Sequence, residues 1–349
     1  MSTASLLLLL CVAAVLLAGL GSSTPAKQRV PLKVQLAQSL IGAAFSFKPL
    51  YKAASAKART GILANGRLIG VDWAERVENY RQSLDDLERR FERIKDAAVV
   101  TPDYYNVPFH AYDEGNLSWQ AAMEVESAAL TVHSNIYTPS RDVLELEGDA
   151  KLRESFHVAM KAALSERVTT FSPSMIVDAG CSTGLSTLKM AESFPSALVF
   201  GVDLSPFMLA VGEHDLTLRP QHSEARKRIT YMHGQAESTS FGPDSIDLFT
   251  MSLVSHELPR AASRAVFQEA YRTLKPGGAF AFMDINPNSA SFQKLAANPF
   301  AFQGFKSTEH WLQDYIDLDL EVELAQVGFV GVSVRSSSPR HRTVVAFKS

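Results

Sequence analysis

Two acids and two glycines lie at a spacing that can bind a nucleoside. The apolar run 175–179 includes Asp178 and leads into a small-residue loop with Gly180 and Gly184. Glycine lets the backbone approach a ligand where a side chain would collide. A second apolar run ends at Asp203, 19 positions after Gly184, and an acid at this place in nucleotide-binding α/β folds accepts hydrogen bonds from a ribose diol. The pattern predicts a buried strand, a tight turn, a helix start and a second strand, with the ligand at the strand ends.

The glycine spacing argues against a dinucleotide. The fingerprint Gly-x-Gly-x-x-Gly would need glycines at 180, 182 and 185, whereas the chain has Ser182 and Leu185. The arrangement Asp-x-Gly-x-x-x-Gly instead resembles motif I of the class I S-adenosylmethionine (SAM) methyltransferases, Asp/Glu-x-Gly-x-Gly-x-Gly. In this chain Ser182 replaces the middle glycine. An acid near the loop suits the cationic amino group of SAM and would repel a phosphate.

Later stretches continue the resemblance. The apolar run 229–233 is followed by loop 234–237, where the family usually has Gly-Asp-Ala against the adenine and this chain has Gln235 in place of Asp. Run 245–251 is similar to the fourth strand of the family. Helical spacing over 265–274 stops at Lys-Pro-Gly-Gly (275–278), where we expect a turn before a fifth strand over 279–284. Runs 328–332 and 343–347 resemble the antiparallel hairpin that ends the sheet of this family.

The resemblance covers roughly half the chain and implies an α/β fold. It implies a Rossmann-like, seven-stranded class I methyltransferase sheet with a terminal antiparallel hairpin, preceded by a helical N-terminal extension. The chain most resembles the type 11 methyltransferase domain and its plastid and cyanobacterial members. The implied cofactor is SAM, with the methionine end near motif I, the ribose at Asp203 and the adenine near Gln235. The expected cofactor-binding residues are Asp178, Gly180, Ser182, Gly184, Asp203, Leu204, Gln235, Ala236, Glu237 and Ser252.

Methyl transfer needs a positioned nucleophile, and some acceptors also need a base. His256 is the first candidate because it follows the fourth strand, and the further candidates are His110, Glu114 and Glu257. The chain lacks the Asn/Asp-Pro-Pro-aromatic tetrad that holds amino nitrogens of nucleic-acid bases, and its body is acidic rather than basic. We therefore expect a small-molecule or lipid-like acceptor, methylated at oxygen or carbon, and no nucleic acid. The histidines are scattered and no cysteine pair exists, so no metal site is expected.

Two other functions stay open from the sequence alone. The replacements at Ser182 and Gln235 are compatible with a non-catalytic SAM-fold module that binds a partner or a lipid. An NAD(P)-dependent oxidoreductase is opposed by the missing third glycine and by the expected terminal hairpin.

The N-terminus carries targeting features. Residues 6–20 form a run of 15 apolar residues, too short for a comfortable membrane span, and predict a signal peptide over 1–23. Of the 34 basic side chains, eight lie in residues 1–71, which contain no acid, so the rest carries 26 basic against 37 acidic residues. Segment 24–71 then reads as the second part of a plastid-targeting sequence, as an amphipathic helix over 34–64 lying on an anionic membrane, or as a solvated helix. The single cysteine outside the signal, Cys181, favours a plastid over the endomembrane lumen or secretion.

Residues 72–145 are expected to form a helical cap or lid, and residues 146–349 the methyltransferase domain. Apolar residues spaced three and four apart predict one helix over 72–98 that packs on the domain; they are Val77, Tyr80, Leu84, Leu87, Phe91 and Ile94. Segment 101–119 is dense in aromatic and polar side chains and is either a lid over the cofactor or a loop held by aromatic anchors. A further helix is expected over 120–137.

Overall fold

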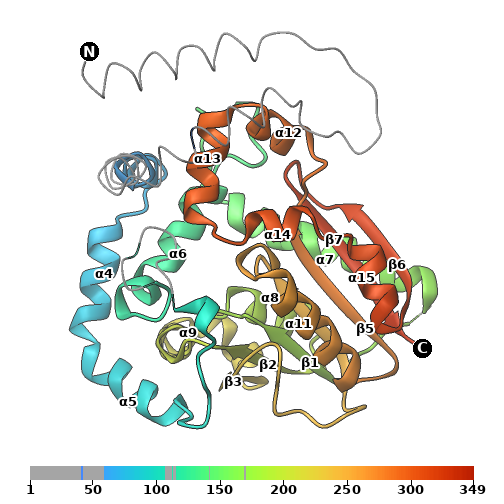
Figure 1. The fold of residues 1–349 in the computed structure, drawn as a ribbon. Helices are drawn as coiled ribbons and strands as arrows, with labels where there is room; N and C mark the ends of the chain where they lie inside the picture. The colour runs from blue at the N-terminus through green and yellow to red at the C-terminus, as the bar shows by residue number, and fades with distance from the viewer. Residues whose placement is uncertain (1–40, 42–58, 107–111, 113–114, 141, 169) are drawn as a thin grey trace.

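A seven-stranded sheet forms the centre of the protein. The computed structural model describes residues 41, 59–106, 112, 115–140, 142–168 and 170–349 (Figure 1). The sheet order is β3-β2-β1-β4-β5-β7-β6, with β1 to β5 parallel and β7 antiparallel to both of its neighbours. This confirms the expected class I methyltransferase sheet and its terminal hairpin. The strands are β1 Met175–Ala179, β2 Leu198–Asp203, β3 Ile229–His233, β4 Ile246–Ser252, β5 Leu274–Ile285, β6 Phe329–Ser336 and β7 His341–Lys348.

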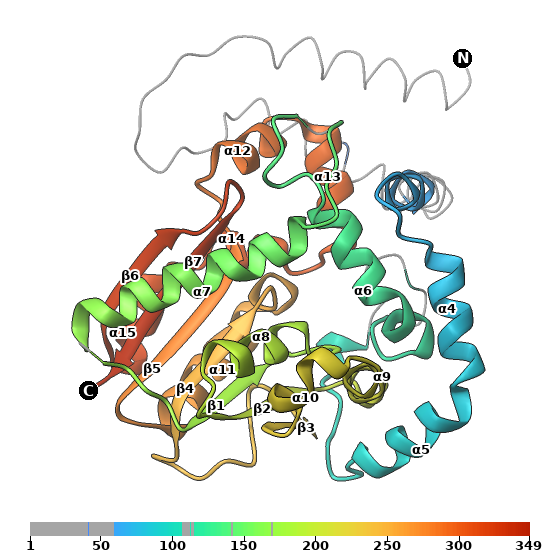
Figure 2. The same cartoon turned by 180° about the vertical axis from the view of Figure 1, so that it is seen from behind.

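Helices cover both faces of the sheet, so the central strands are apolar on both sides. Ile176 of β1 points into a core shared with α7 (Gly148–Arg167) and α8 (Leu185–Ser193). Its neighbour Val177 points into a second core shared with α11 (Arg260–Thr273) and α15 (Leu320–Val327). Figure 1 views the α11 and α15 face, and Figure 2 shows α7 crossing the opposite face. Because successive side chains point to opposite faces and both faces are covered, neighbouring residues of the central strands are apolar.

The turn expected at the Lys-Pro-Gly-Gly motif (275–278) is wrong, because these residues are part of strand β5. Helix α11 ends at Thr273 and β5 begins at the next residue, so residues 275–278 belong to the strand. The register against β4 shifts between the pairs Ile246–Leu274 and Leu248–Ala279, and Gly277 has φ +79°. The motif therefore makes a bulge that absorbs the extra residues within the strand.

The first helical segment is also divided. The single helix expected over 72–98 is wrong, because Ser83 separates α4 (Trp73–Gln82) from α5 (Leu84–Ile94), which runs in a different direction (Figure 1). The apolar stripe nevertheless packs on the domain as expected. Its residue Leu87 is fully buried in a cluster with residues of α6 (Trp119–His133) and α9 (Pro206–Leu218).

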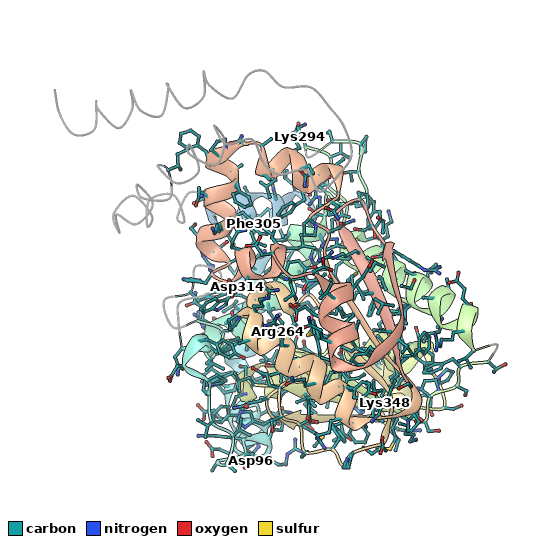
Figure 3. All side chains as sticks on the ribbon, turned by 45° about the vertical axis from the view of Figure 1, so that its right-hand side comes forward. Asp96, Arg264, Lys294, Phe305, Asp314 and Lys348 are labelled. Atoms are coloured by element: carbon teal, nitrogen blue, oxygen red, sulfur yellow. The ribbon has the colours of Figure 1, made fainter. Side chains whose placement is uncertain are left out.

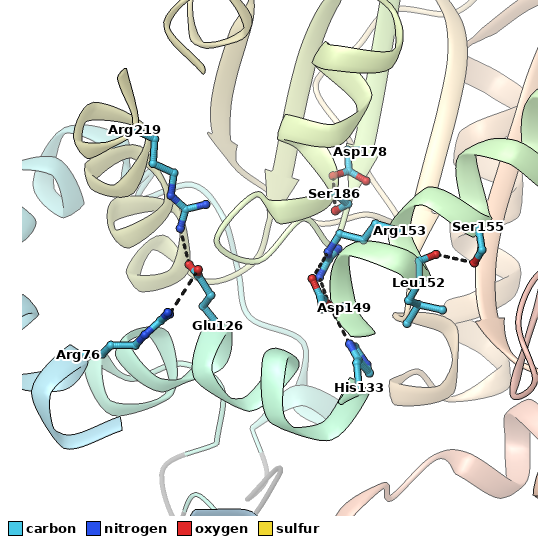
Figure 4. Close-up of polar contacts among 10 residues, drawn as sticks. All are labelled: Arg76, Glu126, His133, Asp149, Leu152, Arg153, Ser155, Asp178, Ser186 and Arg219. Carbon is cyan, nitrogen blue, oxygen red and sulfur yellow. Dashed lines mark hydrogen bonds and ion pairs between the residues drawn. The ribbon is translucent and has the colours of Figure 1, made fainter. Parts of the chain in front are cut away.

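Ion pairs fasten this cap to the sheet domain. Glu126 of α6 pairs with Arg76 of α4 at 3.5 Å and with Arg219, which follows α9, at 2.6 Å (Figure 4). Tyr80 of α4 donates a hydrogen bond to Asp215 of α9 at 2.9 Å. The helical extension is thus attached to the β3 side of the sheet through α9.

Three short helices follow β5. They are α12 Ala290–Ala296, α13 Pro299–Thr308 and α14 Leu312–Ile316. In Figure 3 the labels Lys294 and Phe305 mark α12 and α13 at the end of the molecule opposite Asp96. This insertion lies beyond the carboxyl end of β5, and α14 contacts the turn that follows β4. It therefore borders the edge where the predicted site residues gather.

The predicted signal peptide (1–23) and most of the basic segment (24–71) lie outside the described residues, and of the proposed membrane-lying helix over 34–64 only residues 41 and 59–64 are described. Those interpretations and the plastid destination stay predictions. Within the part of the chain that the structure describes, no helix combines the length and apolar character needed to cross a bilayer.

Leu87→Ala should destabilise the protein by about 2–5 kcal/mol, because it opens a cavity in the contact between α5 and α9. The measurement is the free energy of unfolding in denaturant. Leu68→Ala is the matched control, since Leu68 is 77% exposed whereas Leu87 is 0% exposed. A loss for Leu87→Ala no larger than that of the control would contradict the docked cap.

Candidate functional site

The loop after β1 alternates left-handed backbone positions. Gly180, Ser182 and Gly184 have φ of +68°, +53° and +84°. Ser182 occupies the place of the middle glycine in the family pattern and keeps the conformation that glycine would adopt, at a cost of about 1 kcal/mol. The replacement therefore changes the side chain at this position and leaves the path of the loop as the motif requires.

Asp203 holds this loop on the end of β2. Its carboxylate accepts the backbone N–H of Ser182 at 2.7 Å and that of Ser205 at 2.8 Å. The N–H groups of Gly180 and Cys181 also donate to the carbonyl of Val202. Burial raises the pKa of Asp203 to about 6, although the two N–H donors act in the opposite direction. Asp203, the predicted ribose ligand, is therefore buried and bonded to the motif I loop, and its pKa lies about one unit below neutral pH.

Asp178, near the end of β1, is buried beneath the loop. One carboxylate oxygen accepts the hydroxyls of Ser186 and Thr187, both at 2.7 Å, and the other accepts Thr250 at 3.2 Å (Figure 4 shows the Ser186 bond). Burial raises its pKa, and the three hydroxyl donors oppose that rise. Asp178 thus ties the first turn of α8 to β4, while its predicted role toward the methionine amino group stays a prediction.

A segment of the cap lies along the predicted adenine side. We call residues 96–106 the covering segment; they include the single-turn helix Asp103–Tyr105. Its Asp96 N–H donates to Nδ1 of His233 at 3.0 Å, its Val100 carbonyl accepts from Gln235, and its Tyr104 hydroxyl donates to Glu237. Two of the three partners are predicted adenine-side residues.

His233 links this contact to the second strand. Because Nδ1 accepts from Asp96, Nε2 carries the proton and donates to the carbonyl of Leu204 at 3.1 Å. Burial lowers the pKa of His233, which favours this neutral form. Leu204, a predicted cofactor residue, is therefore held through its main chain, and Ala236 packs against the α11 side of the core.

Asn116 joins the cofactor edge to the edge of β4. Its carbonyl accepts the hydroxyl of Ser205 at 3.3 Å, and its amide donates to Tyr105 and to Glu257, each at 3.3 Å. Burial first, and then the charges of Glu257 and Asp203, raise the pKa of Tyr105 well above its ordinary value. The cap thus contributes Tyr105 and Asn116 to the space between Asp203 and the residues that follow β4.

The turn after β4 gathers ionisable side chains that we call the His256 cluster: His256, Glu257, Asp284 and Glu309. Nδ1 of His256 lies 2.7 Å from Asp284 at the end of β5, and Nε2 lies 4.0 Å from Glu309 at the end of α13. Burial would lower the pKa of His256, but the carboxylates of Asp284, Glu309 and Glu257 outweigh it and raise the pKa to about 9. The first catalytic candidate therefore has a buried carboxylate behind its ring.

The turn after β4, which carries His256 and Glu257, also contains a strained backbone residue. Leu253, directly after β4, has φ +60°, an unfavourable value for leucine. Its N–H donates to the carbonyl of Met283 at 2.8 Å, which keeps the chain along β5 after the predicted cofactor residue Ser252. The next residue, Val254, fills the space that a side chain at Gly180 would need. The strain thus brings the β4 turn against motif I.

Several site residues were not found from the sequence. Asp284 and Glu309 reach the cluster from β5 and α13, and the separation of 52 positions between Glu257 and Glu309 gave no local spacing to detect. One ligand atom each of His256, Glu257 and Glu309 lie within 4.8 Å of one another. The other catalytic candidates, His110 and Glu114, lie outside the described residues.

The described edge fits a nucleoside. A carboxylate offers about four acceptor directions, and Asp203 uses two for backbone N–H groups, so acceptor capacity for a ribose diol remains. Val254 and Tyr231 fill the space beside Gly180 and Gly184, so these glycines set the path of the loop. Gln235 and Glu237 stand on the neighbouring loop. Asp203, Gln235 and Glu237 supply the acceptors and donors that a ribose and an adenine require.

Comparison with known proteins gives consistent matches. Residues 176–278 match a family described as a methyltransferase domain. An uncharacterized methyltransferase of Synechocystis is 34% identical over 158 residues, covering 45% of this chain and 67% of the relative. A demethylmenaquinone methyltransferase of Anoxybacillus flavithermus is 31% identical over 196 residues, covering 51% and 79%. A trans-aconitate 2-methyltransferase of Methylobacterium nodulans is 34% identical over 122 residues, covering 34% and 42%.

Gly184→Ala should weaken SAM binding at least about tenfold, because φ is +84° and the new Cβ would lie 1.7 Å from the hydroxyl of Tyr231. Isothermal titration measures the dissociation constant. Gly242→Ala, where a Cβ meets nothing within 4 Å, is the control and should bind normally. Equal affinities for the two variants would contradict the role of the loop.

SAM binding should weaken as the pH falls through about 6, since only the ionised Asp203 accepts charge-assisted bonds from the ribose. We expect the dissociation constant to rise about tenfold one pH unit below that pKa. Asp203→Asn should bind weakly with a flat pH profile. A wild-type profile equally flat between about pH 7.5 and about pH 5 would count against this carboxylate as the ribose ligand.

Proposed function

The chain belongs to the class I SAM-dependent methyltransferases, and on that premise we propose that it methylates a small-molecule or lipid-like acceptor at oxygen or carbon. SAM is its cofactor. The observation that carries the proposal is the continuity between the Asp203 edge and the His256 cluster. Asn116 bridges them, since it contacts Ser205 on one side and Glu257 on the other.

Aromatic side chains beside the cluster support an acceptor with apolar surface. The Tyr104 and Trp311 rings meet edge-on with centroids 6.5 Å apart, and Tyr315 meets the His256 ring at 6.5 Å. The indole Nε1 of Trp311 is buried and has no hydrogen-bond partner among the described residues. Burying an N–H donor without a hydrogen-bond partner costs stability. An oxygen of the methyl acceptor could accept a hydrogen bond from this N–H.

The printed names of two relatives support a small-molecule acceptor. They give demethylmenaquinone and trans-aconitate as the substrates of those proteins. A small-molecule acceptor is common to both. The aromatic surroundings of the cluster favour a flat or lipid-like acceptor over a small acid.

SAM, when bound, would supply an electrophilic sulfonium methyl carbon: the acceptor would attack that carbon, and the electrons of the broken C–S bond would leave with the sulfur of S-adenosylhomocysteine. The chain itself has three tasks. Asp203 and the loop after β1 hold the nucleoside, and the covering segment excludes water from it. The carboxylates of the His256 cluster take the proton that a hydroxyl acceptor releases.

We further propose that His256 touches the acceptor and that Asp284 positions it. The Asp284 carboxylate accepts from both Nδ1 and the backbone N–H of His256, at 2.7 and 3.1 Å. These two bonds fix the ring so that Nε2 faces away from β5. We propose His110 and Glu114 as further residues that contact the acceptor.

The purified protein, incubated with methyl-labelled SAM and an extract of its own cells, should transfer label to the lipid or small-molecule fraction. Gly184→Ala, with its weaker SAM binding, should label that fraction much less at a SAM concentration below the dissociation constant of the variant. Label confined to the nucleic-acid or protein pellet would contradict the proposed acceptor class.

Asp284→Asn should lower kcat by about 10- to 100-fold with the SAM dissociation constant unchanged, because an amide holds the imidazole less firmly than a carboxylate. Steady-state kinetics separate kcat from KM, and a thermal melt shows whether the variant folds. An unchanged kcat in a folded variant would remove Asp284 and the ring that it orients from the mechanism.

A further inference from the structure

Three members of the His256 cluster form a compact donor set. His256 and Glu257 come from the turn after β4, and Glu309 comes from the end of α13. One ligand atom of each lies within 4.8 Å of the other two. The side chains of His256 and Glu309 are 11% and 6% exposed, so the set is screened from bulk water.

The chemistry of these donors suits a divalent cation. One imidazole nitrogen and two carboxylates form a mixed nitrogen and oxygen set of the kind that binds Zn²⁺, Mn²⁺ or Co²⁺. Donors from two elements far apart in the sequence can surround an ion, whereas neighbouring acids on one helix present a flat surface. Three protein ligands also leave coordination positions for a substrate oxygen.

A second layer of contacts supports the same interpretation. Metal-binding histidines usually have the other ring nitrogen bonded to a carboxylate or carbonyl, which fixes the ring. Here Nδ1 of His256 faces Asp284 at 2.7 Å, and Asp284 is fully buried and also accepts the N–H groups of His256 and Ile285. Nε2 is left as the nitrogen on the side of Glu309 and Glu257.

The charges of the cluster favour a cation as well. Asp284, Glu309 and Glu257 supply three carboxylates around a single imidazole, so even a protonated ring leaves the four residues net negative. Three carboxylates this close create a negative potential that attracts a cation. A divalent ion among the donors would be held by that potential as well as by its ligand bonds.

We propose that His256, Glu257 and Glu309 bind one divalent transition-metal ion, with Asp284 positioning His256. This site deepens the proposed function, on which its role depends: with the ion bound, the ion rather than His256 would contact the acceptor oxygen and lower the pKa of its hydroxyl, whose proton would then pass to water instead of to the cluster carboxylates. The competing explanation is a metal-free ion pair between His256 and the surrounding acids.

The test uses untagged full-length protein, stripped with a chelator and titrated with Co²⁺. Visible ligand-field absorption and isothermal titration report the binding. We expect one saturable site per chain, with Zn²⁺ displacing Co²⁺. Glu309→Gln and His256→Ala should weaken binding tenfold or more, and Asp284→Asn about 10- to 100-fold.

Glu321→Gln is the matched control, because it removes one carboxylate from an exposed position of α15 without touching the cluster. It should bind Co²⁺ like the wild type. SAM affinity of each variant confirms that it has folded.

No saturable Co²⁺ binding, or binding that the cluster variants leave unchanged, would overturn the metal site. If SAM still binds and methyl transfer proceeds after chelation, the proposed function stands and the metal-free ion pair explains the cluster. If Co²⁺ binds but no small-molecule acceptor is methylated, the site stands and the proposed function fails.

Discussion

The carboxylate of Asp203 holds two backbone N–H groups, one from each loop that meets at the end of β2. Through Ser182 it fixes a loop with three left-handed residues, and through Ser205 it fixes the start of α9. The acid is buried, so its charge depends on these donors and on any ligand that adds to them. A nucleoside with a diol is the kind of ligand that completes such a site.

The position of Asp203 next to the start of α9 also places the helical extension. Helix α9 begins next to Asp203 and forms the surface on which α5 and α6 pack. The cap can then extend the covering segment along Gln235 and Glu237 and bring Asn116 to both Ser205 and Glu257. The covering segment and Asn116 therefore border both the predicted cofactor site and the His256 cluster, and they lie outside the residues that match the family.

The sheet could be predicted from the sequence because its central strands are buried on both faces and end in loops that resemble those of the family. Asp203 and the glycines of motif I followed from the same logic, since spacing along one strand–turn–helix unit is local. The break at Ser83 was missed because the apolar stripe keeps its period across it, and the bulge at 275–278 because Pro and Gly also end helices. Asp284, Glu309 and Trp311 could not be predicted, because tertiary packing alone brings β5 and α13 to the turn after β4.

A crystal structure of the protein with S-adenosylhomocysteine tests the central claim most directly. The account predicts both ribose hydroxyls within hydrogen-bond distance of the Asp203 carboxylate, the adenine between Gln235 and Glu237, and the sulfur facing His256. Density for the nucleoside elsewhere, or a ribose held by other side chains while Asp203 contacts only Ser182 and Ser205, would contradict it.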